Sequence, residues 1–266
     1  HLLLEKPVAV DIEGCLEVLR LARRYQRHVV VCHVLRYTKF YGTLYELLRG
    51  GAIGRIESLD AVENVAYWHY AHSYVRGNWR RAEESSPMIL AKSCHDMDII
   101  RWLMGVPCES VSSYGSLDWF RAENAPAQSA ARCIDCPVEK QCPYSAVDLY
   151  YNRRDWISNF DIPAGATLDE VILRELRSGD YGRCVFRCDN DVVDHQVASL
   201  LFENGTTVAF TMCAFSDACD RTVKFMGTRG EIRASMDNNV IEVTQFGAGV
   251  RTGTTAVYTV KPGSTG

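Results

Sequence analysis

The chain has 266 residues, with 29 Lys and Arg against 33 Asp and Glu, for a formal net charge of −4. This acidic balance provides no general attraction to nucleic acid or to anionic membranes. Hydrophobic residues make up 47% and charged residues 23%, as in ordinary globular domains. No stretch approaches the ~20 apolar residues of a membrane span. We therefore expect a cytoplasmic protein with no nucleic-acid or membrane partner.

The first 35 residues predict the end of an α/β unit. Asp11 is a plausible N-cap for a helix that reaches about Arg27, because Ile12, Leu16 and Leu19 recur at helical spacing. The Val-rich run 28–34 then predicts a buried parallel strand. The chain starts with His rather than Met, and we interpret it as N-terminally truncated.

The next eighty residues predict two helices and two strands. Thr38 caps a helix that ends at Gly50, and Ser93 caps another that ends at Gly105. Residues 53–70 and 108–117 are strand-like, and residues 71–86 read as a polar, aromatic and basic loop.

The remainder predicts an insertion followed by a sheet. Residues 118–143 have weak periodicity and read as a Cys-containing insertion, and helical patterns follow at 145–151 and 168–177. The strand-like runs that come after are 192–202, 206–215, 222–226, 231–234, 240–246 and 256–260. Asn204-Gly205 predicts a hairpin turn. The fold class is thus an α/β remnant plus an α+β domain with a large open, mostly antiparallel sheet.

Two segments carry candidate catalytic chemistry. Lys6, in Glu5-Lys6-Pro7, follows an apolar strand, where a desolvated amine can donate to a substrate oxygen and share in proton transfer. His95 falls in the first turn of the helix after Ser93, where the positive helix end disfavours imidazolium and leaves a neutral base. Taken singly, a solvated lysine or a structural histidine would produce the same patterns.

Together these segments resemble the glucose–fructose oxidoreductase, inositol dehydrogenase and MocA family. The motifs occur in order along the chain, as Glu5-Lys6-Pro7, Arg36-Tyr37, the stretch Gly51–Ile56, His95-Asp96-Met97-Asp98 with Trp102-Leu103 and Gly105, and the stretch Met226–Ile232. The resemblance implies that residues 1–35 are the C-terminal remnant of a Rossmann domain. It implies that residues 36–266 form the substrate and oligomerisation domain.

The resemblance also implies the site. Lys6 and His95 become the acid/base pair for alcohol oxidation, and NAD or NADP becomes the cofactor, with contacts from Glu5, Lys6, Pro7 and Arg36. Two departures stand out. Ala91 occupies a position that is often acidic in the family, with Lys92 beside it, and no Gly-rich dinucleotide fingerprint precedes Lys6. We therefore expect the chain as given to bind the cofactor poorly.

A polar aromatic set is the candidate substrate site, because sugar sites combine aromatic faces with hydrogen-bonding groups. The candidate substrate residues are Tyr37, Trp68, His72, Arg76, Trp79, Lys92, Asp96 and His195. A surface loop with chance aromatic residues is the alternative for several of them.

Eleven cysteines include the pattern Cys133-x2-Cys136-x5-Cys142. Two cysteines at this spacing can hold one tetrahedral metal ion, with Cys142 as a third ligand and Cys184 or Cys188 as a fourth. A structural zinc is one expectation, and reduced thiols in a cytoplasmic protein are the other.

The function expected is NAD(P)-dependent hydride transfer on a sugar, cyclitol or related polyol by a homo-oligomeric enzyme. One alternative uses transient oxidation to cleave a glycoside without net NAD consumption. A second alternative is a non-catalytic sugar or dinucleotide sensor on the same fold.

Overall fold

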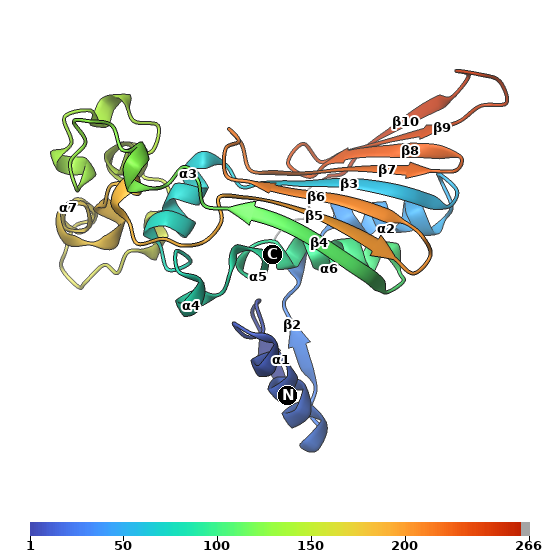
Figure 1. Ribbon diagram of the computed structural model, residues 1–266, viewed down its shortest axis with the longest axis horizontal. Helices are drawn as coiled ribbons and strands as arrows, with labels where there is room; N and C mark the ends of the chain where they lie inside the picture. Colours follow the sequence, from blue (N-terminus) through green and yellow to red (C-terminus); the bar gives the residue numbers. More distant parts are fainter. Residues whose placement is uncertain (262–266) are drawn as a thin grey trace.

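A computed structural model describes residues 1–261. Near the N-terminus, β1 (Leu2–Leu4) pairs in parallel with β2 (Val29–Val31), and helix α1 (Ile12–Arg24) connects them. This small unit projects away from the rest of the molecule (Figure 1). Asp11 is the N-cap of α1 as predicted, and its side chain accepts from the Gly14 N–H at 2.7 Å.

An eight-stranded sheet is the main element of the rest of the chain. Its spatial order is β10-β9-β8-β7-β3-β6-β5-β4, and only β3 and β6 run parallel. The bounds are β3 (Ile56–Asn64), β4 (Cys108–Ser116), β5 (His195–Phe202), β6 (Thr207–Cys213), β7 (Asp220–Gly227), β8 (Gly230–Ser235), β9 (Val240–Gln245) and β10 (Thr254–Thr259). The expected open, mostly antiparallel sheet is confirmed.

Two helices cover one face of this sheet: α2 (Lys39–Arg49) and α6 (Cys94–Met104). Leu44 and Ile100 from these helices share one buried core with strand residues such as Leu59 and Phe225. Thr38 caps α2 as predicted, accepting from the Tyr41 N–H at 3.3 Å. This packing fixes the start of α6 against the sheet.

A lobe of short helices continues from one end of the sheet (Figure 1). Its longest helix is α7 (Leu168–Ser178). Three four-residue helices, α3 (Tyr67–Tyr70), α4 (Ala82–Ser85) and α5 (Met88–Ala91), lie between β3 and α6 in the chain, and α5 packs against α6. Single 3-10 or π turns across the chain are Val34–Tyr37, Ala71–Arg76, Ala122–Asn124, Cys133–Asp135, Glu139–Gln141, Val147–Asn152, Ile157–Asn159, Asp180–Gly182 and Val185–Arg187. A second apolar core lies inside this lobe, around Tyr150 and Ile172.

Three local expectations are wrong. The strand predicted over 53–70 ends at Asn64, because the chain turns at Ala66, where φ is 65°. The predicted loop at 71–86 begins with a buried π turn, in which Val75 and Arg76 have no exposed surface. Ser93 occupies the N-cap position of α6, but its side chain makes no capping hydrogen bond.

Two other signals are confirmed. Gly205, in the turn between β5 and β6, has a φ of +83°, a conformation that glycine adopts without strain. Gly105 ends α6 in the left-handed region, at a φ of +74°. Within residues 1–261, no helix is both long and apolar enough to cross a membrane.

Candidate functional site

Lys6 lies where the N-terminal unit meets α5. Its Nζ donates to the backbone carbonyl of Ala91 at 2.8 Å and lies 5.4 Å from the ring centroid of Trp79. Burial lowers the pKa of Lys6, and the charges of Lys92 and Arg221 act in the same direction, against the opposing effect of Cys94. In place of the acidic side chain often found at position 91, a neutral backbone carbonyl therefore positions the amine.

His95 lies in the first turn of α6, close enough to Lys6 for the lysine charge to affect it. Burial, and then that charge, lower the pKa of His95 to about 4. The Nδ1 atom is buried without a hydrogen-bond partner among residues 1–261. The ring meets the His33 ring edge-on, at 5.8 Å between centroids. The depressed pKa keeps the imidazole neutral near pH 7, and the neutral ring is the form that can accept a proton from a ligand hydroxyl.

The depressed pKa leads to a testable pH dependence. Because folding lowers this pKa, the contribution of His95 to stability is fully present above about pH 6.5 and is lost as the pH falls toward about 4. In an NMR titration, the ring signals of His95 should stay those of a neutral ring from pH 8 down to about 5. The missing signal in a His95→Gln spectrum assigns the resonance. A His95 transition centred near pH 6.5 would contradict the structure.

A buried charge network lies beside this pair. Lys92 Nζ lies 3.2 Å from Glu63 Oε1, and Arg221 Nε lies 2.8 Å from both Glu63 Oε2 and Asp96 Oδ1. The Arg221 Nε–H group donates a hydrogen bond to Asp96 Oδ1. Its contact with Glu63 Oε2 is an ion pair only, and Glu63 Oε2 has no hydrogen-bond partner among the described residues. Burial raises the pKa of both Glu63 and Asp96, and the Arg221 charge opposes this.

Glu63 and Arg221 were not predicted as site residues from the sequence. A signal for Glu63 was available, because inward positions of a strand alternate and Glu63 shares its face with Leu59 and Ala61. A carboxylate on a core-facing position needs a buried partner. Arg221 lies in β7, which pairs with β3 at Glu63, and no local pattern announces that pairing.

The other predicted site residues separate into three groups. Trp79, Lys92 and Asp96 lie near Lys6 or His95, as described above. Trp68 and Arg76 line a different pocket, which also contains Trp156. His72 is buried, and its Nδ1 lies 2.8 Å from the Tyr150 hydroxyl.

Among the described residues, three further predicted contacts make no hydrogen bond or ion pair with Lys6 or His95. The Arg36 guanidinium donates to both carboxylate oxygens of Asp98, at 2.7 and 2.5 Å. Tyr37 is 81% exposed. His195 is the first residue of β5, and its Nδ1 lies 2.8 Å from Asp194 Oδ1. The assignments of these residues to cofactor or substrate stay predictions.

The expected zinc site is not supported. Cys133, Cys136, Cys142 and Cys184 line one small cavity of about 20 Å³ and form no disulfides. Across residues 1–261, however, no group of three or more His, Cys, Asp or Glu side chains is arranged to hold a metal ion. The buried Arg76 guanidinium lines the same cavity, with Nη2 at 3.5 Å from Cys133 Sγ, and places a cation there already.

Comparison with known proteins places these features in a family. Residues 45–256 match the C-terminal alpha/beta domain of an oxidoreductase family. YteT of Bacillus subtilis (strain 168), whose name assigns it to the oxidoreductases, is 24% identical over 236 residues, covering 87% of this chain and 54% of YteT. Inositol 2-dehydrogenase 2 of Saccharopolyspora erythraea is 33% identical over 104 residues, or 39% of this chain and 27% of that protein.

Solved structures share the fold at lower identity. The super-repressor mutant of Gal80p from Saccharomyces cerevisiae superposes with a TM-score of 0.60 at 11% identity, covering 98% of this chain and 54% of that one. The chain spans about half the length of YteT and of this structure. The family match extends over most of the chain and includes the sheet, α6 and His95, so the chain belongs to the glucose–fructose oxidoreductase, inositol dehydrogenase and MocA family of oxidoreductases.

Proposed function

We propose that the protein is an NAD(P)-dependent dehydrogenase or reductase that acts on a hydroxyl carbon of a sugar, cyclitol or related polyol. The observation that carries this proposal is the approach of Lys6 to α6. The Lys6 amine donates to Ala91 O just before that helix, and its charge lowers the pKa of His95 in the first turn. The cationic Lys6 amine and the neutral His95 imidazole thus lie in the same partly buried region.

The residues around Lys6 suit a nicotinamide cofactor. Glu5, Lys6, Pro7 and Trp79 line an open cleft of about 540 Å³, within the ~300–1,000 Å³ typical of cofactor and ligand sites. Trp79 offers a flat aromatic face there, and Lys6 offers a cation. A bound nicotinamide would supply the hydride acceptor or donor.

Lys6, His95 and the neighbouring charge network have different roles in the proposed reaction. In the oxidative direction, His95 takes the substrate hydroxyl proton as the carbon loses hydride and the C–O bond becomes a carbonyl. Lys6 donates a hydrogen bond to the same oxygen and stabilises its developing negative charge. The network of Lys92, Glu63 and Arg221 positions the start of α6 through Asp96. In reduction, Lys6 and His95 polarise the ketone.

We also propose roles for the remaining surfaces. Residues 1–35 are assigned to a nucleotide-binding domain, since α1 buries no side chain and leaves Ile12 72% exposed. The outer face of the large sheet is assigned to homo-oligomer contacts. Tyr114 and Val257 lie on it and are 76% and 60% exposed.

The direct test is hydride transfer by the protein. With NAD⁺ or NADP⁺ and a panel of cyclitols, hexoses and sugar acids, absorbance of reduced cofactor at about 340 nm should rise with at least one substrate. With a glycoside, release of the aglycone without net reduced cofactor would favour the transient-oxidation alternative. Ligand binding with no turnover on any substrate, in either direction, would favour a sensor and overturn the proposal.

A further inference from the structure

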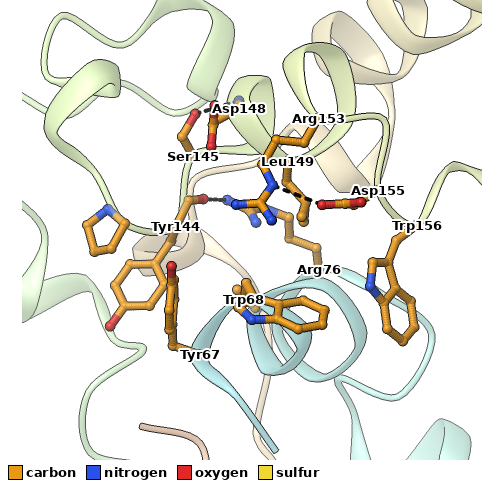
Figure 2. A pocket seen from close by; sticks show the side chains of 12 residues that line it. Tyr67, Trp68, Arg76, Tyr144, Ser145, Asp148, Leu149, Arg153, Asp155 and Trp156 are labelled. Atoms are coloured by element: carbon orange, nitrogen blue, oxygen red, sulfur yellow. Dashed lines mark hydrogen bonds and ion pairs between the residues drawn. The ribbon is translucent and has the colours of Figure 1, made fainter. Parts of the chain in front are cut away.

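A second pocket lies apart from the Lys6 cleft, between the 67–76 segment and the lobe. It has a volume of about 260 Å³, near the lower end of small-ligand sites, which begin at about 300 Å³. Figure 2 shows Trp68 and Trp156 side by side at one edge, with Arg153 and Asp155 above them. The volume matches a single small ring rather than a dinucleotide.

Contacts with neighbouring residues hold the indole rings of Trp68 and Trp156 in place. Trp68 Nε1 donates to the Asp217 carbonyl at 3.2 Å. Trp156 stacks on His69 at 4.6 Å between centroids and stays 37% exposed. Trp156 also adopts a left-handed backbone, with φ at 57°, which is unusual for a bulky residue and marks a position maintained by its surroundings. These rings are preorganised platforms for a ligand.

The ring geometry favours a puckered ligand over a flat one. Trp68 and Trp156 are 5.9 Å apart and inclined by 58°. A planar base sandwiched between two aromatic rings requires nearly parallel faces. A pyranose chair has C–H faces that are not coplanar, and it can contact both inclined rings.

The polar lining favours hydroxyl groups over a net charge. Arg153 donates to Asp155 at 2.9 Å, and Asp148 faces them across the pocket. Arg76 lies at the base with no exposed surface, and its Nη1 has no hydrogen-bond partner among the described residues. The formal charges of two arginines and two aspartates cancel, and together they offer donors and acceptors for a neutral polyol.

The Lys92 charge acts both on a ring beside the pocket and on His95. Trp156 stacks on His69, and burial together with the nearby Lys92 charge lowers the pKa of His69 to about 3. Lys92 in turn pairs with Glu63 next to His95. The Lys92 charge therefore acts on the ring against which Trp156 stacks.

We infer that this pocket is a second sugar subsite for a neutral pyranose, so that the substrate is a glycoside or oligosaccharide whose other ring meets Lys6 and His95. The substrate statement rests on the proposed function, whereas occupancy of the pocket does not. The subsite gives a role to Trp68 and Trp156, which come from different parts of the chain and meet at this pocket.

The first test measures binding without turnover. The 266-residue chain is titrated with the methyl pyranosides of glucose, galactose, mannose and rhamnose while tryptophan fluorescence is followed. At least one should bind, with a dissociation constant on the order of 1 mM. Trp156→Ala should weaken this binding about tenfold, and Trp156→Phe should restore most of it. Phe246→Ala, which removes an exposed ring next to β9, is the matched control and should bind as the unmodified chain does.

Asp148→Ala covers the case in which Trp156→Ala fails to fold, and it should weaken binding about fivefold through a lost hydrogen bond. Failure of all four glycosides to bind, or unchanged binding in the variant that folds, would overturn the subsite. Displacement of the bound glycoside by AMP would also overturn it, in favour of a nucleotide pocket.

A second readout separates this inference from the proposed function. Lys140→Met should leave glycoside binding unchanged, because Lys140 is exposed and does not line the pocket. If hydride transfer is absent but Trp156-dependent binding persists, the redox proposal fails and the subsite stands. If turnover occurs, Trp156→Ala should raise KM for a disaccharide while KM for the monosaccharide stays the same, and equal effects on both would contradict the subsite.

Discussion

Replacing Lys6 by methionine or His95 by glutamine should each lower kcat for hydride transfer by about 10²- to 10⁴-fold, the range for a lost general acid or base. The variants keep nearly the same volume, so substrate binding should change much less than kcat. Steady-state rates of cofactor reduction, with the fitted KM, measure the effect. Because both groups act on one oxygen, the double variant should lose far less than the product of the single losses.

Matched controls are available on the surface. Lys140→Met and His28→Gln alter exposed residues outside the cleft and should retain full turnover. If Lys6→Met and His95→Gln also retain full turnover, the assignment of the active site is wrong. If the unmodified protein binds ligand but never turns over, the sensor role becomes the better account.

Replacing Arg221 by methionine should produce the largest stability loss that the structure implies. Arg221 lies between Glu63 and Asp96, whose side chains are 2% and 8% exposed. Removing one partner of a buried charge group typically costs about 3–5 kcal/mol, because the remaining charges are left without compensation. Both carboxyl groups have raised pKa values, so the loss should be smaller at pH 5 than at pH 8, since protonation relieves their repulsion.

Urea unfolding of Arg221→Met, compared with Arg233→Met, measures this difference. Arg233 also contacts a glutamate, Glu231, but its side chain is 58% exposed, and its loss should cost under about 1 kcal/mol. Adding Glu63→Gln to Arg221→Met should recover part of the stability by removing one of the uncompensated charges. Equal free energies of unfolding for the two arginine variants would show that the network is not energetically important.

Local signals in the sequence predicted most of the secondary structure. Asp11 and Thr38 cap their helices, and Gly105 and Gly205 take the left-handed conformations that their positions indicated. These features depend on a few adjacent residues, so their physics is present in a short window of sequence. Ser93 shows the limit, since its place before α6 was read correctly but its hydroxyl makes no capping bond.

Features that depend on partners far apart in the sequence could not be predicted from the sequence alone. Residues 71–76 read as a polar loop because their burial comes from packing against the lobe, which supplies Tyr150 to His72 and the Arg183 carbonyl to Arg76. The cysteine spacing gave no means of choosing between zinc and reduced thiols, because Arg76, which lines the same cavity, lies 57 residues before Cys133.

The amino-acid order by itself determined which groups are available for chemistry: a lysine after a strand and an imidazole in a first helical turn. Tertiary structure decided the burial and the electrostatic surroundings of those groups. The carbonyl of Ala91 is 85 residues from Lys6, and β3–β7 pairing brings Arg221 to Glu63. Burial and the charges collected there lower the pKa of His95, and both are properties of the space around a side chain rather than of its neighbours in sequence.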